Sequence, residues 1–166
     1  IAAKLFQKIG NEPLLSITRQ AGLWKELKAI PALALGTVEA TVKEAAGAFN
    51  IFAQNGIYTQ PYLISCIKNF DGKTFFEQKI ERRRIIDSCV SGQINSTLAH
   101  QISLLNTRTE SKTSKIPMIG KTGSTNNAQS MWFVGSTPSY TTAVYIGRDD
   151  NIRTEHKKLA SKTAYP

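Results

Sequence analysis

The sequence predicts an α+β fold in which an antiparallel sheet is sandwiched between helices, and two patterns lead to this prediction. Residues 41–55 carry a continuous apolar stripe at helical spacing, which is typical of a helix packed on a core. Residues 117–148 alternate β-rich runs with turn residues, which indicates three strands that follow one another antiparallel. With 166 residues, the chain is long enough for one domain and too short for two of ordinary size.

The amino-terminal region, residues 1–56, is predicted to be mainly helical. Apolar residues recur at helical spacing over residues 1–9, and Gly10 follows as a stop signal, so a first helix ends there. Asn11 is placed to cap a second short helix, which we expect to end at Gly22.

The clearest helix signal lies at residues 41–55. Thr41 and Glu44 have the spacing of a capping box, in which two side chains satisfy backbone N–H groups of the first turn. Gly56 marks the end of the helix. We expect the apolar stripe to pack in the core, and it consists of Val42, Ala45, Ala46, Phe49, Phe52 and Ala53.

Two β-rich runs, residues 62–68 and 74–79, flank turn residues and predict a β-hairpin over residues 62–79. The hairpin contains a Ser-x-x-Lys pattern, Ser65 to Lys68, which resembles the pattern of an acylated serine. That chemistry needs the serine at a helix amino end with the lysine one turn later on the same face. Residues three apart in a strand point to opposite faces, so we do not expect Ser65 to be catalytic.

Another amphipathic helix is expected at about residues 93–106, and the polar residues 107–115 are expected to form an exposed loop. The cluster Arg82–Arg84 is also interpreted as a solvated loop. In the strands that follow, the successive apolar residues 131–134 and 143–146 imply burial on both faces of the sheet, with helices on both sides.

Composition argues against several classes of function. The formal net charge of +9 would suit an anionic partner, but the basic residues are scattered and no aromatic-basic platform indicates nucleic-acid binding. Cys66 and Cys89 lack metal-ligand spacing, and His100 lies far from His156, so neither a metal nor a cofactor is expected. No apolar run reaches the roughly 18 to 20 residues that cross a bilayer. Both chain ends are interpreted as cuts within a longer protein.

The strongest functional signal is a Lys-Thr-Gly-Ser segment, residues 121–124, just ahead of the apolar strands. It combines a cation (Lys121), two hydroxyls (Thr122 and Ser124) and a glycine (Gly123), as one wall of an active site would. A Lys-Thr-Gly tripeptide alone is weak evidence, because it occurs by chance in roughly a few per cent of chains of this length. Its context therefore decides the interpretation.

That context resembles the carboxyl-terminal part of the transpeptidase domain of penicillin-binding proteins, particularly the bifunctional high-molecular-mass kind. The resembling residues are 120–127, then Trp132-Phe133-Val134-Gly135 with Thr137-Pro138, then 143–147 with Asp149-Asp150, and upstream 34–37, 61–64 and 71–73. They follow the order expected for the family and cover most of the chain.

The resemblance implies a D,D-transpeptidase that cross-links D-alanyl-D-alanine stem peptides through an acyl-serine intermediate and is acylated by β-lactams. It assigns catalytic roles to Lys121, as positive charge, and to Ser124, whose N–H would lie in the oxyanion hole. The hydroxyls of Thr122 and Ser124 would bind the substrate carboxylate. Gly123 would let the substrate backbone lie against the strand.

The same resemblance places the remaining active-site groups outside these residues. Ser124-Thr125-Asn126 imitates the family's Ser-x-Asn motif but overlaps the Lys-Thr-Gly-Ser segment, so we expect both the nucleophile and that motif upstream of Ile1. The implied partners are peptidoglycan stem peptides, β-lactams and the upstream part of the same domain, with no nucleic acid. The implied location is the extracytoplasmic face of the bacterial cell membrane, with anchoring through a segment outside this chain.

Several alternatives remain open. A serine β-lactamase or D,D-carboxypeptidase shares Lys-Thr-Gly, although the residues 132–135 and 34–37 favour the transpeptidase. A non-catalytic β-lactam-binding or sensor domain is a second alternative, because the loop before Ala164 lacks the family's usual glycines. A basic nucleic-acid module is the third and is disfavoured.

We also expect the 166 residues alone to be poorly stable and to take up no penicillin. A sheet without its preceding strands and its final helix would expose apolar side chains such as Trp132, Phe133 and Val144.

Overall fold

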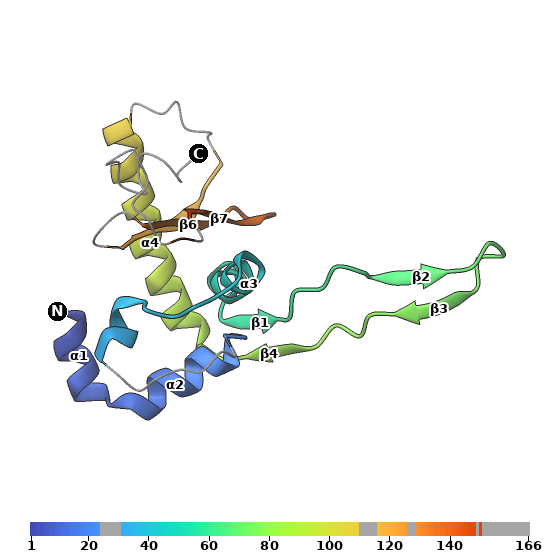
Figure 1. Ribbon diagram of the computed structural model, residues 1–166, viewed down its shortest axis with the longest axis horizontal. Helices are drawn as coiled ribbons and strands as arrows, with labels where there is room; N and C mark the ends of the chain where they lie inside the picture. Colours follow the sequence, from blue (N-terminus) through green and yellow to red (C-terminus); the bar gives the residue numbers. More distant parts are fainter. Residues whose placement is uncertain (24–30, 110–115, 126–128, 149, 151–166) are drawn as a thin grey trace.

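The fold combines helices with antiparallel β-structure, as the sequence predicts (Figure 1). The computed structural model describes residues 1–23, 31–109, 116–125, 129–148 and 150. The helices are α1 (Ala2–Ile9), α2 (Asn11–Gln20), the 3₁₀-helix η1 (Pro31–Leu35), α3 (Val42–Ala53) and α4 (Ser88–Thr109). The strands are β1 (Ile57–Thr59), β2 (Cys66–Lys68), β3 (Thr74–Glu77), β4 (Arg82–Arg84), β5 (Ile119–Ser124), β6 (Ser130–Ser136) and β7 (Thr141–Gly147).

The three carboxyl-terminal strands form one antiparallel sheet with β6 between β5 and β7. Burial alternates along β6. Met131 and Phe133 are only 1% and 4% exposed, whereas Trp132 and Val134 on the other face are half-buried. Both faces are therefore covered, but unequally. Phe133 and Val144, which we expected to be exposed in the chain alone, are buried and half-buried respectively.

The two long helices cover opposite faces of this sheet. On one face, Ile102 of α4 packs against Met131 and Phe133. Thr141 belongs to the other face in the β7 register, and its Oγ1 donates a 2.8 Å hydrogen bond to Asn50 Oδ1 of α3. In Figure 1, α3 lies below the edge-on sheet and the last turns of α4 rise above it. The predicted sandwich is present.

Helix α3 begins with the predicted capping box. Thr41 N–H donates to Glu44 Oε2 at 2.7 Å, and Glu44 N–H donates to Thr41 Oγ1 at 3.2 Å. Five of the six residues of the predicted apolar stripe are half-buried and Val42 is exposed, whereas the buried residues of the helix, Gly47 and Ile51, lie outside the stripe. The reason is that α3 packs against β1 as well as against the sheet, so its most enclosed side lies between these two surfaces.

Two helix starts differ from the prediction. Asn11 is the first residue of α2, and Gly10, with φ 83°, occupies the cap position without a side-chain hydrogen bond. Helix α4 begins at Ser88, well before residue 93, because Asp87 Oδ1 accepts the N–H of Cys89 at 2.8 Å and so caps the first turn. It continues to Thr109, so the start of the predicted loop is helical, and the rest of that loop lies outside the described residues.

Strands β1 and β4 form a two-stranded antiparallel ribbon, so the interpretation of Arg82–Arg84 as a solvated loop was wrong. Arg83 Nη2 donates a 2.8 Å hydrogen bond to Gln20 O, and Arg84 Nη1 donates one of 2.8 Å to Asn55 O. These carbonyls lie at the carboxyl ends of α2 and α3, where helices leave acceptors unsatisfied. The arginines thus fasten the ribbon to the helices.

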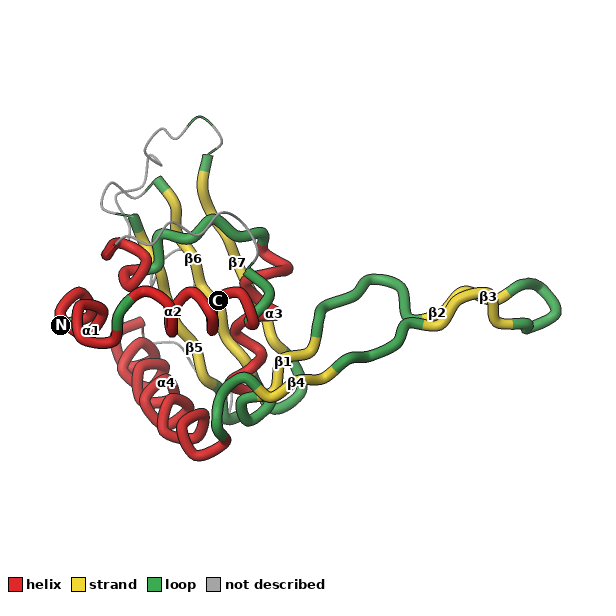
Figure 2. The backbone as a smooth tube through the Cα atoms, turned by 90° about the horizontal axis from the view of Figure 1, so that it is seen from below, coloured by secondary structure: helices red, strands yellow, loops and turns green. Residues whose placement is uncertain are grey.

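The predicted hairpin is present as β2 and β3, which pair Ile67 with Phe76 across a β-bulge. It forms the end of an arm, defined as residues 60–81, that extends away from the helices and the sheet (Figures 1 and 2). The arm leaves an unusual number of large apolar side chains exposed: Tyr62, Leu63, Ile64, Ile67, Phe70, Phe75, Phe76 and Ile80.

Candidate active site

The Lys-Thr-Gly-Ser segment forms the second half of β5, whose only neighbour among the described strands is β6. Lys121, Gly123 and Ser124 are exposed, and Thr122 is half-buried. A strand with one free side presents backbone N–H and C=O groups that an extended peptide can pair with. The segment is therefore placed where a peptide could align along it.

The register divides the three side chains of the segment between the two faces of the sheet. Thr122 lies opposite Phe133 and Ser124 opposite Met131, so both hydroxyls belong to the face that α4 covers. Lys121 is on the α3 face. The two hydroxyls thus lie on one face of β5, and the lysine lies on the other face of the same strand.

The ammonium group of Lys121 lies close to the strand. Its Nζ donates a 2.7 Å hydrogen bond to the backbone carbonyl of Thr122, the adjacent residue. Within the described ranges no carboxylate pairs with Lys121.

The glycines of β5 have different neighbours. A Cβ on Gly120 would lie 2.7 Å from Ile102 Cδ1 and 2.9 Å from Phe133 Cζ, closer than real contacts allow. A Cβ on Gly123 would meet only Trp132 Cβ, at an ordinary 3.6 Å. Gly120 is therefore required for packing α4 on the sheet, a role that the sequence did not reveal. Packing does not require a glycine at position 123, so another reason must account for Gly123.

Residues immediately behind the segment were also missed in the sequence. Trp132 pairs with Gly123 in the register, and its ring lies 4.8 Å from that of Tyr145 on β7, tilted by 48°. The Tyr145 hydroxyl is 3.3 Å from Ser130 Oγ. Cross-strand pairing of the predicted runs could have indicated the aromatic pair, but the register had to be known first.

The Ser-x-x-Lys and Ser-x-Asn patterns found in the sequence lie in two different parts of the fold. Ser65 lies in the arm, where its carbonyl accepts the N–H of Gln78 at 2.8 Å, so it is not at a helix amino end facing Lys68. Figure 2 shows the arm extending away from the sheet that contains β5. Ser124 belongs to β5, and Asn126 lies outside the described residues.

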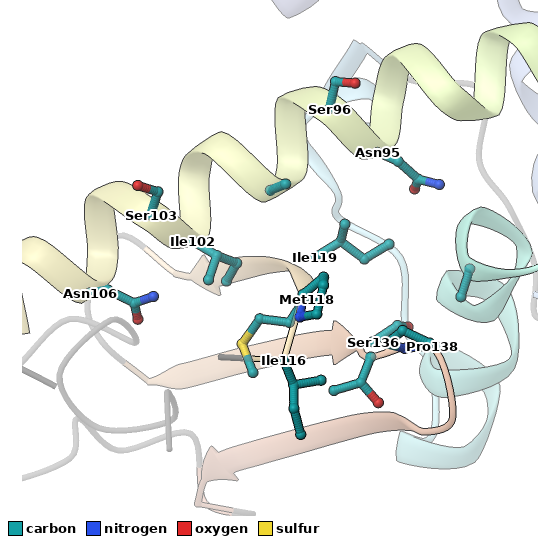
Figure 3. A pocket seen from close by; sticks show the side chains of 14 residues that line it. Asn95, Ser96, Ile102, Ser103, Asn106, Ile116, Met118, Ile119, Ser136 and Pro138 are labelled. Carbon is teal, nitrogen blue, oxygen red and sulfur yellow. The ribbon is translucent and has the colours of Figure 1, made fainter. Parts of the chain in front are cut away.

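An open pocket of about 710 Å³ lies between α4 and the residues that lead into β5. It is near Ile119, at the opposite end of β5 from Ser124. Figure 3 shows Ile102, Met118 and Ile119 at its apolar centre and Ser96 and Ser103 pointing away. Among the described residues that line the pocket, none has an ionisable side chain.

In the part of the chain that the structure describes, no group of three or more His, Cys, Asp or Glu side chains is arranged to hold a metal ion. None of the described helices is both long and apolar enough to cross a bilayer.

Comparison with known proteins gives a consistent picture. Residues 15–165 match the model of the penicillin binding protein transpeptidase domain. Penicillin-binding protein 1F of Bacillus subtilis is 38% identical over 143 residues, which cover 81% of this chain and 20% of that protein. The crystal structure of penicillin-binding protein 1A from Haemophilus influenzae has a TM-score of 0.83 at 22% identity, covering 96% of this chain and 30% of that one.

A third similarity is to penicillin-binding protein A of Mycobacterium tuberculosis as an imipenem acyl-enzyme complex, with a TM-score of 0.75 at 17% identity. It covers 98% of this chain and 42% of that structure. Among the curated relatives, this chain spans only about a fifth of the full length, from 19% to 24%. The similarity therefore concerns one part of a much larger polypeptide.

Proposed function

Because this chain belongs to the penicillin-binding protein transpeptidase family, we propose that it supplies the Lys-Thr-Gly-Ser wall of a D,D-transpeptidase active site. The observation that carries the proposal is the placement of Lys121, Thr122, Gly123 and Ser124 along an edge strand, with both hydroxyls on one face. An extended stem peptide would lie along this edge, in the manner of an added strand.

Each group of the segment has a defined task in acyl transfer. A serine hydroxyl from outside these residues attacks the carbonyl of the penultimate D-alanine, and the terminal D-alanine leaves with a proton on its amine. The N–H of Ser124 stabilises the oxyanion that forms during this attack; losing one such donor typically costs 10²–10³-fold in rate. The hydroxyls of Thr122 and Ser124 bind the substrate carboxylate. An acceptor amine then attacks the acyl-serine and completes the cross-link.

Lys121 adds positive charge to the groove. Its Nζ donates to Thr122 O in the structure, and rotation of its flexible side chain would bring the ammonium toward the substrate or toward the serine of a Ser-x-Asn motif. Such a cation would stabilise an anionic substrate and assist proton movement. Gly123 would allow the substrate backbone to approach, since no packing contact requires a glycine at this position.

The nucleophile and the Ser-x-Asn motif come from the upstream part of the same domain in this proposal. Support comes from the position of Ser65, which lies in the arm immediately before β2 and not at the amino end of a helix. The working location is the extracytoplasmic side of the bacterial membrane, in cell-wall synthesis, with a membrane anchor outside this chain. β-Lactams are expected ligands, since a structural relative was solved as an imipenem acyl-enzyme complex.

A labelled penicillin tests the proposal in the complete protein. We expect Lys121→Ala to reduce the acylation rate at least about 100-fold, because it removes the charge at the site. Lys73→Ala is the matched control, because Lys73 is exposed in the arm turn, and it should acylate like the wild type. Equal labelling of a folded Lys121→Ala variant would count against the assignment.

Peptide mapping and product analysis distinguish the alternatives. The acylated peptide should lie outside residues 1–166, and Ser65→Ala should leave labelling intact; an adduct on the Ser65 peptide would refute the division of the site. With stem peptides, cross-linked dimers indicate a transpeptidase and free tetrapeptide a D,D-carboxypeptidase. Rapid hydrolysis of the penicillin indicates a β-lactamase, and stable labelling without turnover of peptides indicates a sensor.

A further inference from the structure

The residue after the Lys-Thr-Gly-Ser segment ties the end of β5 to the start of β6. Thr125 Oγ1 accepts the backbone N–H of Gln129 at 3.0 Å and that of Ser130 at 3.1 Å. The N–H of Thr125 donates to the carbonyl of Ser130 at 3.0 Å. One side chain thus accepts two backbone N–H groups at the start of β6, just beyond the pair that Ser124 forms with Met131.

This tie is connected to the third strand of the sheet. Ser130 Oγ lies 3.3 Å from the Tyr145 hydroxyl, and the Tyr145 ring packs on Trp132. Trp132 is in turn the register partner of Gly123. The Ser124 end of β5 is therefore held by contacts that reach across β6 to β7.

Such support matters at this point because strand ends fray once their ladder stops. A backbone N–H that stabilises an oxyanion must be aligned before the reaction, and a displacement of about 1 Å can cost roughly 100-fold in rate. The peptide unit that carries the Ser124 N–H is only one residue away from the Thr125 tie. Loss of the Thr125 hydrogen bonds would allow the Ser124 N–H to shift, although the N–H itself would still be present.

We propose that Thr125 is a positioning residue that aligns the Ser124 N–H for acyl transfer by accepting the N–H groups of Gln129 and Ser130. The inference rests on the proposed function of the segment. The proposed role depends on the Oγ1 atom of Thr125. Replacing this hydroxyl with a methyl group of similar shape, as in valine, should therefore abolish the role.

Thr137, at the other end of the sheet, provides a matched control for Thr125. Thr137 Oγ1 accepts the N–H of Tyr140 at 3.1 Å and that of Ser139 at 3.4 Å, and the N–H of Thr137 donates to Tyr140 O at 2.8 Å. The same chemistry therefore closes the β6–β7 turn, far along the strands from Ser124. Thr137→Val removes an equivalent pair of accepted hydrogen bonds, together with a 3.4 Å hydrogen bond from Thr137 Oγ1 to Tyr140 O, without touching the segment.

The experiment compares Thr125→Val, Thr125→Ser and Thr137→Val in the complete protein. Two constants are measured with a labelled penicillin: the dissociation constant of the first complex and the rate constant of acylation. We expect Thr125→Val to lower the rate constant about tenfold or more, as displacement costs less than removal of the donor, with the dissociation constant changed less than about twofold. Thr125→Ser keeps the acceptor and should acylate like the wild type. Thr137→Val should lower the melting temperature as much as Thr125→Val does but leave acylation unchanged.

Two results would overturn the inference: a Thr125→Val rate equal to the wild type, or a Thr137→Val loss as large as that of Thr125→Val. If Thr125→Val does not fold, Thr125→Cys replaces it, because sulfur is a weak acceptor and should give an intermediate loss; wild-type acylation by Thr125→Cys and Thr125→Ser alike would also refute the inference. Lys121→Ala is run in parallel. Full labelling of that variant would reject the function of the segment, whereas its loss with an unaffected Thr125→Val rejects only the positioning role.

Discussion

The sheet and the arm are built from similar sequences but have opposite environments. Both contain β-rich runs with large apolar residues. In the sheet, Phe133 is 4% exposed, whereas Phe75 in the arm is 73% exposed and Phe70 at its tip is fully exposed. The apolar character of a strand therefore does not by itself show that the strand is buried.

The difference follows from what each pair of strands lies against. The sheet has a third strand, and α4 packs Ile102 on its inner face. The arm has two short strands, and none of its residues belongs to the core clusters formed by the described residues. A two-stranded hairpin alone is marginally stable in water, and it becomes stable when a third strand or a helix covers one face.

The largest expected effect contrasts two phenylalanines. Phe133→Ala should lower the free energy of unfolding by about 3–5 kcal/mol, because it removes a buried ring and leaves a cavity against Ile102. Phe75→Ala should change it by less than about 0.5 kcal/mol, because the ring is exposed. Urea denaturation of the complete transpeptidase domain measures both. A large loss with Phe75→Ala would show that the arm is buried in the complete protein.

A second pair of substitutions separates packing from function within β5. Gly120→Ala should cost roughly 1–3 kcal/mol, because the added methyl group would overlap Ile102 and Phe133. Gly123→Ala should leave stability within about 0.5 kcal/mol and slow acylation by a labelled penicillin. Melting curves and labelling rates of the two variants check this. Equal stability losses would contradict the assignment of different roles to these glycines.

The ribbon of β1 and β4, from which the arm extends, should be shielded from water like the core and unlike the arm. Tyr58 on β1 is 6% exposed, and burial raises its pKa above the ordinary value of 10.0; Arg83, 5.0 Å from the ring centre, opposes this shift and Glu44 adds to it. A raised folded-state pKa means that the neutral phenol stabilises the fold below pH 10, and this contribution is lost as the pH rises further. The phenolate absorbance of the wild type minus that of Tyr58→Phe should therefore titrate above pH 10. An ordinary titration would show that the base is open to water.

Substitutions on the surface of the arm should have the smallest effect on stability. They should nevertheless change the solubility measurably. Phe70→Lys with Phe75→Lys should leave the melting temperature of the chain unchanged and reduce its aggregation, since exposed apolar patches promote association. Light scattering against protein concentration measures this. The double variant Lys68→Ala with Lys73→Ala is the control, and it should aggregate at least as readily as the wild type. If aggregation persists in the first variant, another surface is responsible.

Local signals in the sequence determined much of this protein. The Thr41–Glu44 capping box, the hairpin and the three strands at the carboxyl end depend on neighbouring residues, and all are present. The Lys-Thr-Gly-Ser segment was recognised from its residues and their context, and the family match agrees with that recognition. Its catalytic roles stay predictions until the variants are measured.

Tertiary structure decided what depends on residues far apart in the chain. Arg82–Arg84 is a strand because β1 pairs with it and because helix carbonyls accept its guanidinium groups. A Cβ at Gly120 would collide with Ile102 and Phe133, and Thr125 ties the end of β5 to the start of β6. The arm is exposed because, in the part of the chain that the structure describes, no third strand covers it. Hydrophobic patterns and caps depend on interactions between residues that are close in the sequence. Burial and close approach depend on which residues, distant in the sequence, pack against an element.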